Sequence, residues 1–354
     1  MDLLNLQITL EEKLKYIVKV VDNSNKYTYN VMAAPINFDY AGNPATLRNA
    51  ELNVKRSETR LTKTVNDADG AVHNGQTVTY TVNVKVPSID PTATNKLFKV
   101  TDALTGAEYK KDTVVVKLGD SKINIAPTFD DATNSFELDL SSFIDDTNSN
   151  AGKDVTITYD VLVTSENDKV TNTANVSRTG SENYSSDSVD LYEGAITLTK
   201  TNDYEKESDK KLLAGAGFNV LDKDGNVLKF VDKGNNTYVL AKDQTVTTGV
   251  VTEVVTGANG QLVVKGLDKG EYQFKEVTAP DGYSINETNS SATLTITGDK
   301  ATAEFTADTD MRDTEVGALP ETGGIGTTIF TVGGCAIMVA AAALFFMNKK
   351  KHEK

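Results

Sequence analysis

The chain has 354 residues, a formal net charge of -14 and a single cysteine, Cys335. This length allows two or three domains, and the 39% hydrophobic content allows packed cores instead of a disordered chain. The acidic balance argues against a nucleic acid partner, because phosphate contacts need clusters of lysine and arginine. A lone cysteine excludes a disulfide framework.

The first ten residues lack the basic start and the long apolar run of a secretory signal. The C-terminus nevertheless has the features of an exported protein, as described below. We therefore expect that a signal peptide and part of a domain precede residue 1. On this interpretation residues 1–57 are a truncated N-terminal domain fragment.

Residues 15–315 have the pattern of a β protein. Short segments rich in Val, Thr, Tyr and Ile alternate apolar and polar residues, as strands with one buried face do. Asp-Gly and Lys-Gly pairs between these segments predict turns. The expected strands include residues 77–86, 155–163, 170–176, 195–200 and 292–296. Their spacing predicts an all-β fold of tandem immunoglobulin-like β-sandwiches.

The tetrapeptide Leu-Thr-Lys-Thr occurs twice, at residues 61–64 and 198–201. Each copy lies in a segment with strand character, so we interpret each as the first strand of a domain. The repeat divides the chain into a β-sandwich at 58–192 and a second β-sandwich at 193–315. Residues 316–354 remain as a C-terminal region of different character.

Residues 325–347 contain no charged side chain, and lysines 349–351 follow them closely. A helix of this length spans about 35 Å, enough to cross the apolar core of a bilayer. The basic tail should stay in the cytoplasm. The sequence therefore predicts a C-terminal transmembrane helix at 325–347, with a buried core helix as the alternative.

The pentapeptide Leu319, Pro320, Glu321, Thr322 and Gly323 stands before this apolar segment. Proline fixes its own φ and disfavours helix at the residue before it, so the motif should be extended and accessible to an enzyme groove. Motif, apolar segment and basic tail together resemble the sorting signal of Gram-positive cell-wall proteins. The resemblance implies that a sortase cysteine attacks the threonine carbonyl and passes the resulting thioester to an amine.

The segment 271–283, EYQFKEVTAPDGY, resembles the E-box of Gram-positive pilins, and its domain resembles the SpaA/CnaB-type immunoglobulin-like fold. In that family a buried lysine of the first strand forms an isopeptide bond with Asn or Asp on the last strand, and a buried glutamate promotes the reaction. The resemblance assigns these roles to Lys200, Asp313 and Glu276. The family more often has Asn as acceptor, so an Asp here implies release of water instead of ammonia.

The period of a strand supports this choice of acceptor, because Asp313 shares a face with Phe305 and Met311. Asp308 and Asp310 fall on the opposite face, and a slip in register would make one of them the acceptor instead. The alternative without a covalent bond is a partly buried salt bridge among the same three side chains.

The middle domain resembles the D2-type isopeptide-forming domain of fimbrial subunits. The resemblance assigns the lysine to Lys63 in LTKTV and the promoting carboxylate to Asp102 in FKVTDALT. The acceptor would be Asn172 in VTNTANV, whereas Asn175 lies on the other face of that strand. The alternative is that Asn172 is a surface residue on an edge strand.

Enzyme-like constellations are missing from the sequence. The only histidines are His73, in a segment that we expect to be a solvated turn, and His352, in the basic tail. No Ser-His-Asp or Cys-His site and no zinc site can be built from them. We therefore expect no enzymatic activity, no metal and no cofactor.

These features predict a secreted, peptidoglycan-anchored structural subunit of a surface pilus. Its expected partners are a sortase and either peptidoglycan or other pilin subunits, with a membrane-spanning stage before sorting. The alternative is a wall-anchored adhesin that binds host matrix proteins through a region missing here. Residues 1–57 contain no Tyr-Pro-Lys-like pilin motif, so the sequence leaves both open.

Overall fold

The computed structural model describes residues 60–89, 93–164, 168–295 and 305–316, strands between residues 5 and 58, and helical residues 335, 337–339 and 341–342. Nearly all the regular structure is β, which confirms the predicted fold class. The predicted segments 77–86, 155–163 and 170–176 are found as strands with nearly the same ends.

Among the described residues, the N-terminal part contributes seven short strands in three small sheets. β1, β2 and β4 form an antiparallel sheet, while β3 pairs with β7 and β5 pairs with β6. The bounds are β1 (Asn5–Glu11), β2 (Lys15–Val21), β3 (Tyr27–Tyr29), β4 (Met32–Pro35), β5 (Phe38–Asp39), β6 (Thr46–Leu47) and β7 (Arg56–Glu58).

The first large unit is a β-sandwich. One sheet has the order β14-β13-β17-β10-β8, with β12 beside β17, and the facing sheet begins β15-β16-β11-β18-β19. Every second residue of β10 and β17 is buried, so one face of each strand packs into a shared apolar core. The bounds are β8 (Thr62–Val65), β10 (Thr77–Lys85), β11 (Phe98–Thr105), β12 (Ala107–Tyr109), η1 (Lys111–Thr113), β13 (Val115–Leu118), β14 (Ser121–Ile123), β15 (Thr128–Asp130), β16 (Ser135–Asp139), η2 (Ser141–Phe143), β17 (Asp154–Val163), β18 (Lys169–Arg178) and β19 (Ser181–Asn202).

The second large unit is another sandwich. One sheet contains the end of β19, then β24, β22 and β21, with β27 parallel to β19, and the other has the order β23-β20-β25-β26. Its core is a separate apolar cluster that includes Phe218, Phe230 and Phe274. The bounds are η3 (Glu207–Asp209), β20 (Gly217–Leu221), β21 (Phe230–Asp232), β22 (Thr237–Leu240), β23 (Glu253–Val255), β24 (Gln261–Leu267), β25 (Gly270–Thr278), β26 (Ser290–Leu294) and β27 (Thr306–Asp313).

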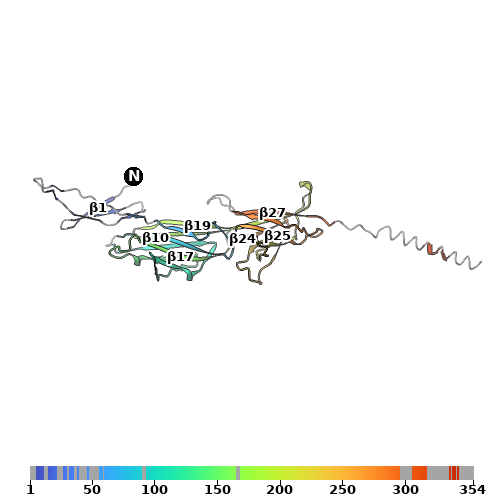
Figure 1. Ribbon diagram of the computed structural model, residues 1–354, viewed down its shortest axis with the longest axis horizontal. Helices are drawn as coiled ribbons and strands as arrows, with labels where there is room; N and C mark the ends of the chain where they lie inside the picture. The colour runs from blue at the N-terminus through green and yellow to red at the C-terminus, as the bar shows by residue number, and fades with distance from the viewer. Residues whose placement is uncertain are drawn as a thin grey trace, which may run out of the picture.

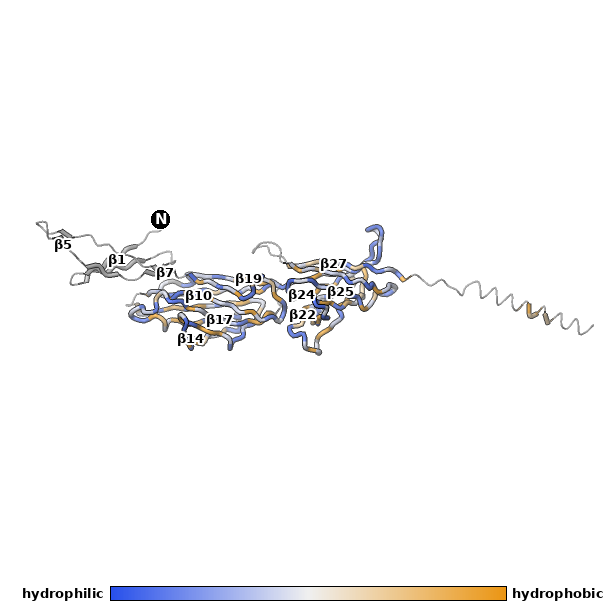
Figure 2. The backbone as a smooth tube through the Cα atoms, viewed as in Figure 1, coloured by the Kyte–Doolittle hydropathy of each residue, from blue (hydrophilic) through white to orange (hydrophobic). Residues whose placement is uncertain are grey.

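Strand β19 belongs to both sandwiches. Up to Tyr192 it pairs with β18 of the first, and from Ala195 it pairs with β24 and β27 of the second. Figure 1 shows the two units following each other along the long axis, one around β10 and β17 and the other around β24, β25 and β27. In Figure 2 the colour alternates along these strands, as expected for sheets with one buried face.

A loop of the first sandwich completes the junction. Its strand β9 (Ala71–Val72) pairs with β19, and its two residues are buried in different cores: Ala71 in the second and Val72 in the first. Asn74 donates from Nδ2 to the Leu240 carbonyl at 2.6 Å. The predicted turn is found, since the His73 carbonyl accepts a hydrogen bond from the Gln76 N–H at 3.0 Å. His73 is half-buried instead of fully solvated, because the second sandwich contacts this loop.

Within the part of the chain that the structure describes, no helix is long and apolar enough to cross a membrane. The described helical residues 335, 337–339 and 341–342 fall in the segment predicted to span it, and the rest of 325–347 lies outside the described residues. The motif at 319–323 also lies outside them.

Candidate functional site

Lys63, Asp102 and Asn172 come together between the two sheets of the first sandwich. Lys63 enters from β8 in one sheet, and the other two side chains enter from β11 and β18 in the facing sheet. Lys63 Nζ forms an ion pair with Asp102 Oδ2, and neither side chain has any exposed surface. Asn172 is also fully buried.

Strand register explains why Asp102 and Asn172 share this site. β11 and β18 are antiparallel neighbours, with Asp102 opposite Ala174 and Asn172 opposite Leu104. Positions two residues apart point to the same face, so both polar side chains point into the core. The other candidate, Asn175, is only half-buried.

Two tyrosines that sequence reasoning missed complete the first cluster. The Tyr159 hydroxyl, from β17, contacts Lys63 Nζ and accepts a hydrogen bond from Asn172 Nδ2 at 3.0 Å. The Tyr109 hydroxyl donates to Asp102 Oδ1 at 2.8 Å. Tyr159 shares its face of β17 with Ile157 and Val161. A hydroxyl group among apolar residues on a buried face is the sequence signal that could have identified Tyr159 as part of the site.

Burial changes the protonation preferences in this cluster. Desolvation lowers the pKa of Lys63, against the attraction of Asp102. Desolvation also raises the pKa of Asp102, against the effects of Lys63, Tyr159 and Tyr109. Both shifts favour a neutral amine beside a neutral acid, and a neutral amine is the nucleophilic form of lysine.

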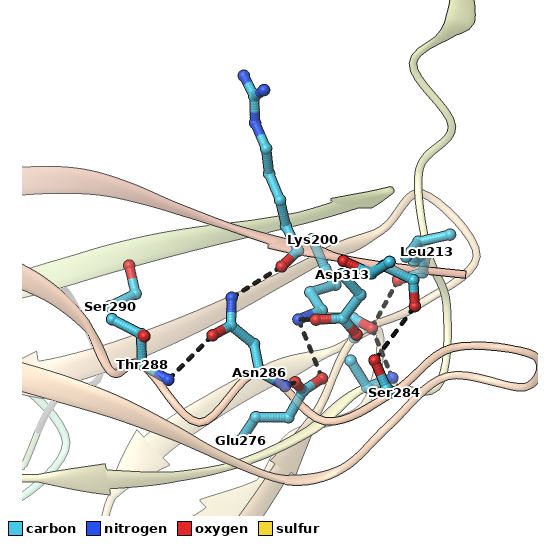
Figure 3. A network of polar contacts seen from close by, with 12 residues as sticks. Lys200, Leu213, Glu276, Ser284, Asn286, Thr288, Ser290 and Asp313 are labelled. Carbon is cyan, nitrogen blue, oxygen red and sulfur yellow. Dashed lines mark hydrogen bonds and ion pairs between the residues drawn. The ribbon is translucent and has the colours of Figure 1, made fainter. Parts of the chain in front are cut away.

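Lys200, Glu276 and Asp313 form the corresponding cluster in the second sandwich (Figure 3). Lys200 Nζ contacts Asp313 Oδ1 and lies 3.0 Å from Glu276 Oε1, and all three side chains lack exposed surface. Lys200 and Asp313 come from the adjacent parallel strands β19 and β27. Glu276 reaches them from β25 in the facing sheet.

Among the acidic residues of β27, only Asp313 points inward. It is 1% exposed, whereas Asp308 and Asp310 face solvent. The register slip that would bring one of these two to Lys200 does not occur in the structure. Asp313 Oδ2 is buried and has no hydrogen-bond partner among the described residues.

Asn286, also missed from the sequence, orients Glu276. Its backbone N–H donates to Glu276 Oε2 at 2.7 Å, and its side chain donates to the Arg312 carbonyl in β27 at 2.8 Å. Desolvation raises the pKa of Glu276, against the Asn286 and Lys200 interactions. The carboxyl is therefore held in place and kept ready to carry a proton.

Comparisons with known families identify two regions of the chain. Residues 194–310 match the SpaA prealbumin-like fold domain, and residues 313–354 match the LPXTG cell wall anchor motif. A search of curated protein sequences found no match. The first match fits the immunoglobulin-like sandwich predicted for this part of the chain.

Solved structures of pilins have the same fold. The T6 backbone pilin of serotype M6 Streptococcus pyogenes is 18% identical, with a TM-score of 0.59, over 88% of this chain and 84% of that one. The group B streptococcus pilus 2b backbone protein is 20% identical, with a TM-score of 0.52, over 73% and 99%.

The full-length major pilin SpaD from Corynebacterium diphtheriae is also 20% identical, with a TM-score of 0.51, over 85% of this chain and 79% of that one. Identities this low show a shared fold. The two family matches show a SpaA prealbumin-like domain at residues 194–310 and an LPXTG cell wall anchor motif at residues 313–354, and the anchor motif indicates a location at the cell wall.

Proposed function

We propose that this protein is a structural backbone subunit of a surface pilus, joined by sortase through Thr322 and stabilised by two internal isopeptide bonds. The observation that carries the proposal is the pair of buried lysine clusters. Lys200 contacts both its carboxyl partner and its acceptor, whereas Lys63 contacts Asp102 and shares the Tyr159 hydroxyl with its acceptor Asn172. The fold shared with the T6 and SpaD pilins supports it. In this proposal, residues 58–192 and 193–315 are the cross-linked domains.

The first bond would join Lys63 to Asn172. The neutral amine attacks Asn172 Cγ, the new C–N bond forms, and the bond from Cγ to Nδ2 breaks, so that ammonia leaves. Asp102 promotes the reaction because it accepts the proton that would otherwise keep Lys63 charged. The bond would tie the first strand of the sandwich to a strand of the facing sheet.

The second bond would join Lys200 to Asp313. The amine attacks Asp313 Cγ, the new C–N bond forms, and the bond from Cγ to the protonated carboxyl oxygen breaks, so that this oxygen leaves as water. Among the described residues, Oδ2 is the carboxyl oxygen of Asp313 without a hydrogen-bond partner. Glu276 donates a proton to the departing oxygen and regains one from the lysine nitrogen, so it acts as a true catalyst. The bond would tie β19 to β27, the last strand before the sorting motif.

A folded core makes these reactions feasible without another enzyme. Groups held in a reactive orientation can gain about 7–11 kcal/mol over the same groups free in solution. Both sites are closed to solvent, so water does not compete with the amine for protons. The bonds would resist mechanical unfolding as disulfides do, in a protein whose single cysteine is Cys335.

Expression of the complete gene in a Gram-positive host with a pilus sortase tests the pilus function. We expect wall extracts to contain a ladder of covalent multimers that survives denaturing electrophoresis. Thr322→Ala should abolish the ladder, whereas Thr327→Ala, beyond the cleavage site, should preserve it. Wall-attached monomers alone would contradict the backbone role and favour a wall-anchored adhesin.

A further inference from the structure

We propose that Tyr159 is a catalytic residue that transfers a proton from the attacking Lys63 amine to the departing Asn172 nitrogen. The inference rests on the Lys63–Asn172 bond proposed above and adds a group to its chemistry. Its basis is position: one hydroxyl oxygen contacts both Lys63 Nζ and Asn172 Nδ2. These are the two nitrogen atoms between which a proton must move.

The remaining contacts single out this hydroxyl. Within the described ranges, Tyr159 is the one hydrogen-bond partner of Asn172 Nδ2. Asp102 contacts Lys63 with one oxygen and Tyr109 with the other, and its carboxyl also interacts with Tyr159. Of these groups, the Tyr159 hydroxyl is the one that contacts the leaving nitrogen.

The chemistry requires such a group. An amide nitrogen leaves as ammonia only when it gains a proton, and the attacking amine must lose one when the new bond forms. A tyrosine hydroxyl has one donor hydrogen, which can rotate, and two acceptor sites. Tyr159 would give its hydrogen to Nδ2 and take one from Nζ, so ammonia leaves and the hydroxyl is restored.

The surroundings keep Tyr159 suited to this task. Desolvation and the nearby Asp102 hold the pKa of Tyr159 well above its ordinary value, so the hydroxyl keeps its proton. The ring is fixed by stacking on Tyr80, with centroids 5.9 Å apart, and by an edge contact with Phe136 at 5.2 Å. A phenylalanine at this position would keep those ring contacts and lose only the hydroxyl.

Tyr159→Phe tests the transfer by intact mass of the purified ectodomain over time. We expect loss of ammonia to slow by about 10²-fold or more, the usual contribution of a general acid–base group. Fresh protein should then be incompletely cross-linked. Tyr80→Phe is the matched control, because the Tyr80 hydroxyl is buried without a hydrogen-bond partner in the described part of the chain. It should mature like the wild type.

The outcomes separate this inference from the function on which it rests. A wild type that never loses ammonia would overturn the proposed bond itself. A wild type and a Tyr159→Phe variant that lose ammonia equally fast would overturn the transfer and leave the bond intact. Loss of water at Lys200–Asp313 reports folding of the second domain in every sample.

Near-ultraviolet circular dichroism and limited proteolysis would report whether the first domain of Tyr159→Phe folds. If it does not, 3-fluorotyrosine at position 159 keeps the shape and lowers the pKa of the phenol. A changed maturation rate then supports the transfer, and an unchanged rate contradicts it.

Discussion

Lys200 Nζ lies 3.0 Å from Glu276 Oε1, and neither side chain has any exposed surface. A carboxyl group this deeply buried is costly as a charge. The raised pKa of Glu276 is in line with this, since desolvation is its largest cause. The Glu276 carboxyl is therefore a proton donor beside the nucleophilic amine of Lys200.

Glu276→Gln should block the second cross-link and leave the first intact. Glutamine keeps the size of the side chain but cannot exchange a proton with the departing oxygen. The intact mass of the variant ectodomain should therefore regain one water and still lack one ammonia. Glu271→Gln, at an exposed position of the same strand, should match the wild type. A water loss that persists in Glu276→Gln would remove the catalytic role of this carboxyl.

Asp313→Asn should keep the second bond and change what it releases. An amide acceptor loses ammonia where a carboxyl acceptor loses water, so the variant should fall short of its sequence mass by two ammonias. The same change at Asp310, which faces solvent on the same strand, should leave the shortfall as in the wild type. If Asp310→Asn altered the released molecule and Asp313→Asn did not, the assignment of the acceptor would be wrong.

Much of this arrangement could be predicted because strands repeat every two residues. The period placed Asn172 and Asp313 on inward faces and Asn175, Asp308 and Asp310 on others, and the structure has these orientations. The resemblance to pilin families assigned the roles of Lys63 and Lys200, and each of these lysines stands in a copy of the repeated LTKT segment.

The period could not predict contacts between sheets. Tyr159 reaches Lys63 across β10 of its own sheet and reaches Asn172 in the facing sheet, and no local pattern encodes either contact. Asn286 is a loop residue whose backbone, and not its side chain, contacts Glu276. The loop at His73 looked like an exposed turn because the sequence does not reveal that a second domain covers it.

The Lys63–Asp102 pair should make the stability of an uncross-linked variant lowest near neutral pH. Asn172→Ala prevents the bond and leaves the pair buried. Asp102 has a raised pKa in the folded state. Above pH 3.8 the unfolded state releases the Asp102 proton while the folded state still holds it, so the stability of the folded state falls as the pH rises above 3.8. Lys63 has a lowered pKa in the folded state. Just below pH 10.5 the unfolded state therefore holds a proton on Lys63 that the folded state has already lost, and the stability of the folded state rises as the pH approaches 10.5.

Urea unfolding of the first domain at acid, neutral and alkaline pH measures this minimum in stability. Asn172→Ala should be compared with the same variant that also carries Lys63→Met and Asp102→Asn. The difference in unfolding free energy between the two should depend on pH in the direction described. A difference that does not change with pH would show that burial does not shift these groups.

Gly75→Ala should loosen the junction between the two sandwiches. Gly75 has a φ of +84°, and a Cβ there would lie 2.1 Å from the Lys242 backbone oxygen in the second sandwich. The left-handed backbone costs a side-chain-bearing residue about 1–2 kcal/mol, and the contact must also open. Hydrogen exchange of the Asn74 amide, which donates to the Gly266 carbonyl, should become about tenfold faster or more.

Gly180→Ala is the control for the backbone effect alone. Gly180 has a φ of +76°, and no atom lies within 4 Å of a Cβ built there. Gly180→Ala should leave the hydrogen exchange rate of the Asn74 amide unchanged. Equal effects of the two substitutions would mean that the close contact with Lys242 does not hold the junction.

The intact mass of the purified wild-type ectodomain, residues 58–316, shows most directly whether the two cross-links form. We expect a mass below that of the sequence by one ammonia plus one water, with linked peptides that join Lys63 to Asn172 and Lys200 to Asp313 after proteolysis. A mass equal to that of the sequence would contradict both cross-links, and with them the covalent stabilisation proposed for this protein.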